Sequence, residues 1–356
     1  MKKVAVFWII LGSIFSSSSW GADAFKFFKM PTEYTLPTRI AIDKTGTVWF
    51  IESNLNKIGR FQPAKGVFSE HNITTPSSAP TDVTISNTGK LWLTESNANQ
   101  IGVLDPISLS FKEYDIPTIS SNPGKIASDL RGNIWFTEFY GNKIGVFDPR
   151  KEAFREYPVP TPASRPSGIV VDKKGVVWFL ETEGNKLASL NPQDGAIHEF
   201  DLPRSHETPR DLAIDGSGVL WFGGHIGRDL ITFNPSTKKF KTFLMPSNGA
   251  IESLTAGIDG KIFCTLLTSS KIAVFDPVTS AFLELDVGGA WDTKISPNVR
   301  KTGTSAILDL DPDEKVIKSK PNGIAADSRG DIWFVDMDKD TLIKLDASIV
   351  AKLWVK

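Results

Sequence analysis

The chain contains seven copies of one repeat, and this repetition constrains the fold more than any other feature of the sequence. An aromatic residue recurs every 42 or 43 positions through six copies, and the seventh follows after a longer step of 70. A proline stands twelve residues before it in six copies, and a glycine three before it in all seven. A period of this length is typical of solenoids and β-propellers. The aromatic column consists of Trp49, Trp92, Trp135, Trp178, Trp221, Phe263 and Trp333.

Each copy contains four short runs of strand-forming residues separated by turn residues. In the fourth copy these runs are residues 168–171, 176–180, 186–190 and 196–202. A single four-stranded sheet cannot bury both of its faces, but sheets stacked around an axis can. We therefore predict an all-β fold, a seven-bladed β-propeller of four-stranded antiparallel blades, in one domain over residues 25–356.

The ring of blades must close, and two terminal segments could supply the last strand. The run from Phe25 to Met30 resembles the fourth strand of a copy, such as residues 111–116, and the run from Lys352 to Val355 is the alternative. The longer last step places an insertion at about 288–319, between the sixth and seventh copies. A lid over one mouth of the propeller and a plain surface loop both fit this insertion.

The first 24 residues are predicted to be a signal peptide. Lys2 and Lys3 precede an apolar run from Val4 to Phe15, and small residues around Ala22 suit cleavage. The apolar run is short for a membrane span. We expect a periplasmic or secreted protein that has no membrane span once the signal is removed.

Charge and cysteine content exclude some classes of protein. The formal net charge is −1, so we expect no basic surface of the kind that binds nucleic acid. Cys264 is the only cysteine, which rules out an internal disulfide bond, and its place in a strand run predicts a small buried residue. We expect a monomer whose partner is a small molecule or another protein.

Three motifs of the third copy carry a family resemblance. It reads Trp-Phe-Thr-Glu at 135–138, Asn-Lys-Ile-Gly at 142–145 and Glu-Tyr-Pro-Val-Pro at 156–160. In these motifs the chain resembles the streptogramin B lyase (virginiamycin B lyase) family of seven-bladed propellers, from about Phe25 to the C-terminus. The resemblance implies a magnesium-dependent lyase that linearises a cyclic depsipeptide antibiotic by removing a Cα proton, so that the ester oxygen leaves.

The chain departs from the family at the positions that would carry this chemistry. The family pattern places a histidine directly after the repeat proline in two neighbouring blades, an acid before the second of these prolines and another acid after the Trp-Phe of that blade. Here Lys320 precedes the last repeat proline, and Asp336 or Met337 holds the position of the other acid. Asn322 follows this proline, where the family pattern has a histidine, and an asparagine cannot act as a general base. The column after the proline contains no histidine and consists of Thr38, Thr81, Gly124, Ser167, Arg210, Glu252 and Asn322.

Three functions stay open at this point, and the sequence leaves open whether the chain is an enzyme. The first is the binding of a small molecule or a partner by a propeller that lacks the catalytic histidines of the family. The second is an enzyme with rearranged site residues, either a metal-assisted lyase that breaks a C–O bond or a lactone hydrolase. The third is a scaffold for protein contacts.

A ligand is predicted at one mouth of the channel. The strand that opens each blade lies nearest the axis, so the one or two residues after the repeat proline should form a ring of side chains. These residues vary in charge and size from blade to blade, which suits an asymmetric molecule. His225 follows two glycines in the irregular fifth copy and could join them. The predicted ligand-binding residues are Arg39, Asp82, Lys125, Arg210, Glu252, Asn322 and His225.

A second column is acidic in five copies. It stands three residues after the aromatic column, and a ring of carboxylates could hold a hard cation such as Mg²⁺ or Ca²⁺. Alternatively, each acid bonds the backbone or the Asn-Lys pair of its own or the next blade. The candidate metal ligands are Glu52, Glu95, Glu138, Glu181 and Asp336.

Overall fold

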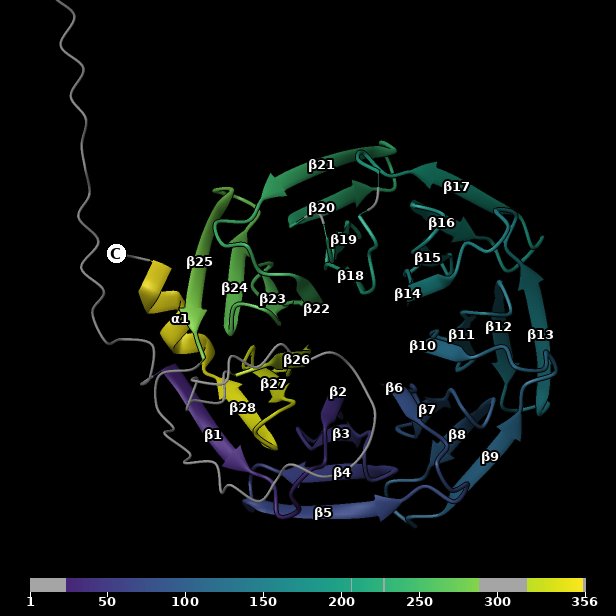
Figure 1. Cartoon of the computed structure of the whole chain (residues 1–356), viewed down its shortest axis with the longest axis horizontal. Helices are drawn as coiled ribbons and strands as arrows, with labels where there is room; N and C mark the ends of the chain where they lie inside the picture. Colours follow the sequence, from purple (N-terminus) through teal and green to yellow (C-terminus); the bar gives the residue numbers. More distant parts are fainter. Residues whose placement is uncertain (1–23, 206, 227, 288–318, 355–356) are drawn as a thin grey trace, which may run out of the picture.

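The computed structural model describes residues 24–205, 207–226, 228–287 and 319–354. Seven four-stranded antiparallel sheets are arranged as blades of one ring, which confirms the predicted fold (Figure 1). The predicted signal peptide and the insertion lie outside the described residues, except for their last residues Ala24 and Ser319. Among the described residues no helix has the length and apolar character needed to cross a membrane.

The first four blades each use four consecutive strands of the chain. The first contains β2 (Pro37–Ile42), β3 (Val48–Glu52), β4 (Lys57–Gln62) and β5 (Val67–Asn72), and the second contains β6 (Pro80–Ile85), β7 (Leu91–Glu95), β8 (Gln100–Leu104) and β9 (Phe111–Asp115). The third contains β10 (Pro123–Ser128), β11 (Ile134–Glu138), β12 (Lys143–Asp148) and β13 (Ala153–Pro158), and the fourth contains β14 (Pro166–Val171), β15 (Val177–Glu181), β16 (Lys186–Leu190) and β17 (Ile197–Asp201).

The last three blades include one that is assembled from both ends of the chain. The fifth contains β18 (Leu212–Ile214), β19 (Leu220–Gly223), β20 (Asp229–Asn234) and β21 (Lys239–Leu244), and the sixth contains β22 (Ile251–Ala256), β23 (Ile262–Leu266), β24 (Lys271–Asp276) and β25 (Ala281–Asp286). The seventh contains β26 (Pro321–Ala326), β27 (Ile332–Asp336), β28 (Thr341–Leu345) and, as its outer strand, β1 (Phe25–Lys29).

The N-terminal strand closes the ring. Strand β1 pairs antiparallel with β28, with Phe25 opposite Leu345 and Lys29 opposite Thr341. The C-terminal alternative is wrong, because residues 347–354 form the helix α1 (Ala347–Trp354). Asp346 begins this helix by accepting a hydrogen bond from the backbone N–H of Ser348 at 2.9 Å, as a helix cap does.

The aromatic column packs between neighbouring blades. Trp333 and Val335 of the seventh blade share one apolar cluster with Phe50 and Phe61 of the first blade, and Trp333 is only 1% exposed. A buried indole N–H needs an acceptor. In five blades an aspartate six residues before the tryptophan supplies it, as Asp43 does for Trp49 at 3.1 Å. Cys264 is buried as predicted.

Backbone conformation explains two further columns of the repeat, the mostly asparagine column and the glycine column. The residue seven after the aromatic column has a positive φ in every blade, for example 57° at Asn56 and 51° at Asn142. Asparagine tolerates this left-handed conformation better than most residues. The glycine column occupies the turn between the first two strands of each blade, where Gly46 has a φ of 81°.

Because β1 closes the ring, its buried side chains should matter more than its exposed ones. Phe25 is 6% exposed and packs edge to face against Phe334, with ring centroids 5.8 Å apart. We expect Phe25→Ala to lower the free energy of unfolding by about 3–5 kcal/mol, as for other buried phenylalanines. The exposed Lys29→Ala variant of the same strand should cost less than about 1 kcal/mol. Urea unfolding of both variants measures this, and a cost below about 1 kcal/mol for Phe25→Ala would contradict closure by β1.

Candidate functional site

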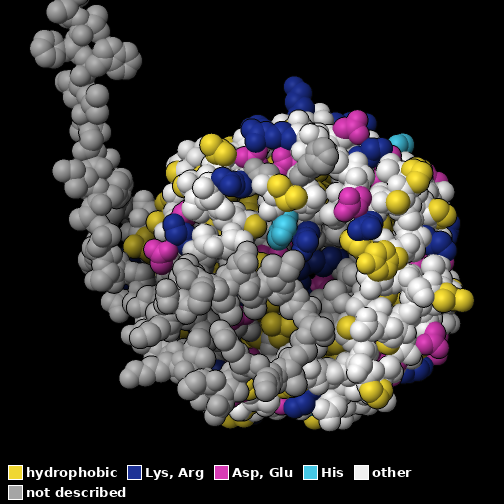
Figure 2. Space-filling model, in the orientation of Figure 1, with side chains coloured by type: hydrophobic (Ala, Val, Ile, Leu, Met, Phe, Trp, Pro, Cys, Tyr) yellow, Lys and Arg dark blue, Asp and Glu magenta, His cyan; other side chains and the backbone are white. Residues whose placement is uncertain are grey.

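The predicted ligand-binding residues meet where the innermost strands begin. Arg39 lies on β2, Asp82 on β6, Lys125 on β10 and Glu252 on β22, so that four different blades each contribute a side chain. Lysine and arginine side chains gather in the hollowed centre of the face seen in Figure 2. Because β2, β6, β10 and β22 are the strands nearest the axis, these charges can reach one another across the channel (Figure 1).

Asp211 is the centre of this cluster. Its carboxylate forms an ion pair with Lys125 Nζ at 2.6 Å and faces Arg39 Nη1 at 3.7 Å. The hydroxyl of Ser253 donates to it at 2.5 Å and the backbone N–H of Leu254 at 3.3 Å. Burial acts to raise the pKa of Asp211, but Lys125 and Arg39 outweigh it and hold the pKa at about 2. Asp211 is therefore ionised under all ordinary conditions.

The interpretation of the sequence missed Asp211 as a ligand-binding residue. It follows the repeat proline by two positions, which is also the offset of Arg39, Asp82 and Lys125. That shared offset was the signal that could have found it. In the fifth blade the innermost strand β18 begins only at Leu212, so Asp211 lies just before the strand.

The cluster continues from Arg39 to the fifth and sixth blades. Arg39 Nη2 lies 3.5 Å from Glu252 Oε1, and Glu252 Oε2 lies 3.7 Å from His225 Nδ1. Burial, and then the positive charge of Arg210, lower the pKa of His225 below its ordinary value, although Glu252 opposes this. His225 is therefore mostly neutral at pH 7, with a ring nitrogen that could accept a proton.

Asp82 is the second acid of the cluster. Burial raises its pKa above the ordinary range, although Lys125 and Arg39 act against this. Its Oδ2 accepts a hydrogen bond from the backbone N–H of Ile126 at 3.1 Å, which ties the second blade to the third. The cluster thus holds two acids with opposite pKa shifts a short distance from the same two cations.

Several buried polar atoms of the cluster have no hydrogen-bond partner. Arg39 Nη1, His225 Nδ1 and Asn322 Oδ1 are buried and form no hydrogen bond with the described residues. A buried polar atom without a hydrogen bond costs about 1–3 kcal/mol. Arg210, the remaining predicted residue, is exposed beside them. The structure therefore brings the seven predicted residues to one end of the channel region, with Asp211 at their centre.

The acidic column has a different setting. Glu52, Glu95, Glu138 and Glu181 end the second strands of the first four blades and are fully buried. Burial raises the pKa of each to about 7, and a second glutamate nearby in the blade adds to this effect. Their carboxyl oxygens form no hydrogen bond of ordinary geometry with the described residues. These four glutamates are thus neutral or half ionised near pH 7.

The lysine of the repeat bonds a different acid from the one expected. Lys57 Nζ forms an ion pair with Glu70 of the outer strand at 2.7 Å, and Lys143 and Lys186 do the same with Glu156 and Glu199. These cations therefore do not neutralise the acidic column directly, which explains why its pKa values stay high. The alternative of an Asn-Lys partner for the column is not supported by these contacts.

The magnesium that the family resemblance implies does not fit the described residues. Among them no three His, Cys, Asp or Glu side chains are grouped to hold a metal ion. Asp336, the fifth member of the acidic column, is bound instead by the hydroxyl of Ser319 and by the backbone N–H of Lys320. The described acids are therefore not arranged to hold a magnesium ion, and the carboxylate ring stays a prediction from sequence.

Comparisons with known proteins agree with the fold. The sequence profile of the virginiamycin B lyase family matches residues 20–232 and 131–282. A comparison with curated protein sequences gave no match. Among solved structures, a streptogramin B lyase is 25% identical over 90% of this chain and 97% of its own, with a TM-score of 0.78. A virginiamycin B lyase from Staphylococcus aureus is 26% identical over 90% of this chain and 98% of its own, also at 0.78.

A more distant likeness shows the fold alone. The extracellular domain of a putative hybrid two-component system from B. thetaiotaomicron is 15% identical, with a TM-score of 0.65. The match covers 90% of this chain and 39% of that one. The fold and the axial cluster together define a seven-bladed β-propeller with a charged site at one end of its axis. Within that class, the chain belongs to the virginiamycin B lyase family.

The raised pKa values of the buried glutamates predict how stability depends on pH. Glu138 takes up its proton at about pH 7 when folded and near 4.5 when unfolded, so the folded state loses stability as the pH rises from 4.5 to 7. We expect Glu138→Gln to match the wild type at pH 4 and to be more stable by about 2–3 kcal/mol above pH 7. Urea unfolding across this range measures the difference. The exposed Glu33→Gln should show no such trend, and equal stabilities of Glu138→Gln and wild type at pH 8 would contradict burial of Glu138.

Proposed function

We propose that this protein is exported and binds a small polar molecule at the channel mouth. The observation that carries the proposal is the convergence of Arg39, Asp82, Lys125, Asp211 and Glu252 from five different blades. A set of charges of both signs at one place can bind a molecule that carries donors and acceptors together. The start of the sequence, with its basic and apolar runs, supports export.

Stability alone is a weak reason for such a cluster. Removing charges from water costs several kcal/mol per ion, and buried ion pairs are often no better than apolar residues of the same volume. The contacts at 3.5 and 3.7 Å around Arg39 are looser than the 2.6 Å pair of Lys125 with Asp211. Arg39 is therefore held near its acids while still able to bond a ligand. The open atoms of His225 and Asn322 support the same interpretation.

The positions of the family catalytic residues favour binding over catalysis of the family type. Asn322 replaces a histidine and donates its amide to Met337 Sδ at 2.7 Å. Lys320 replaces an acid and pairs with Asp338 at 2.9 Å. Asp336 already accepts bonds from Ser319 and the backbone. None of these groups is left free to take a Cα proton.

One observation keeps a lyase or a lactone hydrolase as the second candidate. His225 lies 3.7 Å from Glu252, and its lowered pKa leaves its imidazole unprotonated near pH 7. A neutral histidine beside a carboxylate is a reasonable general base. Membership of a family with known lyases adds weight. In that case His225, from the fifth blade, would replace the missing histidines.

Binding is tested with a thermal-shift screen of amino acids, short peptides, nucleosides and quinupristin, followed by calorimetry on any hit. Quinupristin is included because a solved structure contains it together with a catalytically inactive virginiamycin B lyase from Staphylococcus aureus. We expect Arg210→Ala and Lys125→Met each to weaken binding about tenfold or more, because each removes a charged hydrogen-bond donor from the site. Chromatography of quinupristin after incubation separates the two candidates: it should elute unchanged if the protein only binds.

Lys241→Ala is the matched control, because Lys241 is an exposed lysine on the outer strand β21. Its affinity should equal that of the wild type. Unchanged affinity in both channel variants, with normal melting temperatures, would remove this mouth as the binding site. A linearised product that disappears in His225→Ala would favour the second candidate.

A further inference from the structure

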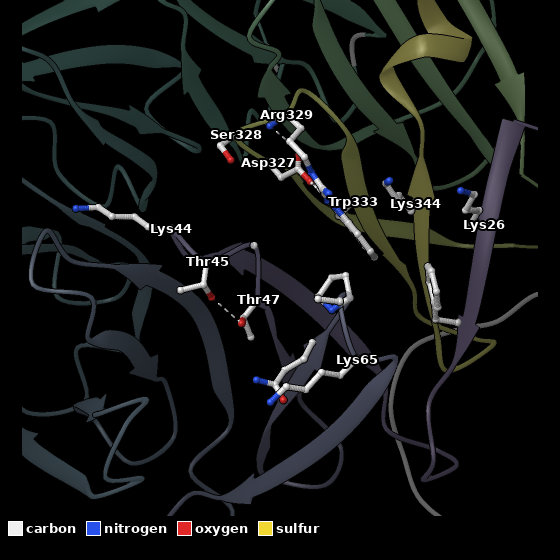
Figure 3. Close-up of a pocket in the computed structure, with 15 residues that line it drawn as sticks. Lys26, Lys44, Thr45, Thr47, Lys65, Asp327, Ser328, Arg329, Trp333 and Lys344 are labelled. Atoms are coloured by element: carbon white, nitrogen blue, oxygen red, sulfur yellow. Dashed lines mark hydrogen bonds and ion pairs between the residues drawn. The ribbon is translucent and has the colours of Figure 1, made fainter.

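A cavity lies near the end of the innermost strand β2 that is opposite the channel cluster. Its volume is about 580 Å³, within the range of small-molecule sites. It occupies the seam between the seventh and first blades, where the ring closes (Figure 3). The first blade supplies the turn of Lys44 and the turn of Lys65, and the seventh supplies Arg329, Lys344 of β28 and Lys26 of β1.

The seam enlarges a groove that also occurs elsewhere in the ring. Between the third and fourth blades the corresponding turns enclose about 190 Å³, and apart from Trp135 that groove is lined by turn residues. At the seam the cavity extends along both outer strands of the seventh blade, to Lys344 and to Lys26 and Phe28 of the N-terminal strand. A groove between the fourth and fifth blades, which includes Trp178 and Phe200, is nearly as large, at about 520 Å³. Size alone therefore does not distinguish the seam cavity, but its five basic side chains do.

Positive charge exceeds negative charge in this seam cavity. Arg329 is neutralised by Asp327 at 3.2 Å and Lys344 by Asp331 at 2.5 Å. Lys26, Lys44 and Lys65 form no ion pair within 4 Å and no side-chain hydrogen bond with the described residues, although the charge of Lys26 helps to lower the pKa of Asp346. Figure 3 shows Lys44 and Lys65 on one side of the cavity and Lys26 on the other, beside Lys344. The amino end of Lys44 is directed away from the cavity in this view, so this exposed side chain must rotate to reach a ligand. Three cations on opposite walls are thus available to a ligand.

We propose that the seam cavity binds a small organic molecule that carries two or more negatively charged groups. One anionic group would bind Lys44 and Lys65 of the first blade, and another would bind Lys26 on the seventh. Phe28 and Pro63 supply apolar surface for the carbon skeleton between them. Carboxylates and phosphates share this chemistry, because both accept charge-assisted hydrogen bonds from lysine. This site is independent of the channel cluster and of the function proposed for it.

The test measures binding of citrate, pyrophosphate, inorganic phosphate and acetate by calorimetry at 150 mM salt, on the whole chain. We expect saturable binding of citrate or pyrophosphate and none of acetate, because a single carboxylate cannot reach both walls. The tighter of the first two identifies the carboxylate or the phosphate as the preferred group. In the double variant Lys44→Ala with Lys65→Ala, the affinity should fall about tenfold or more.

The control is Lys173→Ala with Lys151→Ala. These lysines hold the same positions in the turns of the fourth and third blades, so the control removes the same net charge outside the seam. Its affinity should stay within about twofold of wild type. No saturable binding of citrate or pyrophosphate, or an equal loss in the control, would overturn the proposal. All four lysines lie in exposed turns, so unchanged melting temperatures should accompany both double variants.

Discussion

Ring closure by the N-terminal strand is the constraint on which the rest of this structure depends. Strand β1 supplies the outer edge of the seventh blade through its pairing with β28, and the aromatic column then packs the seventh blade on the first. Unless these blades meet, Arg39 of the first blade cannot lie 3.7 Å from Asp211 of the fifth. The channel cluster is thus a product of closure, since its members come from segments more than 170 residues apart.

The channel cluster and the buried glutamates show two ways in which one fold handles buried charge. Asp211 stays ionised because two cations and two hydrogen bonds compensate for burial. Glu138 and its three counterparts lack such partners, so burial holds their pKa near 7 and favours the neutral acid. The first arrangement keeps fixed charges where a ligand can use them. The second gives blades that tolerate a buried acid at a cost that depends on pH.

The repeat made the fold predictable from sequence, and its irregular positions limited what could be said about the site. In six blades the column that holds the proline, or Ile251 in the sixth copy, marked where the innermost strand begins. This was sufficient to place Arg39, Lys125 and Glu252 together. The order of contacts was not predictable, because it depends on which blades face each other across the axis. Asp211 was not predicted because Arg210, directly after the proline of the same blade, is also charged and fits the same ring of side chains.

The seam cavity could not be predicted from the sequence, for a different reason. Lys26 and Lys344 are adjacent only because the two ends of the chain share one blade, and the sequence left two candidates for the closing strand. The alternative using Lys352 to Val355 failed because Asp346 caps a helix that begins at Ala347, a local signal the strand interpretation overlooked. Once β1 closes the ring, three unpaired lysines fall around one cavity.

The pKa of the Asp211 carboxyl tests the central claim most directly. The claim is that closure of the ring brings Lys125 and Arg39 against this one buried acid. Carbon-13 NMR of labelled aspartate side chains, with Asp211→Asn to assign the signal, measures the pKa on the intact chain. The account predicts a pKa of about 2. A pKa at or above the ordinary value of 3.8 would show that the cations do not converge on Asp211, and would contradict the account.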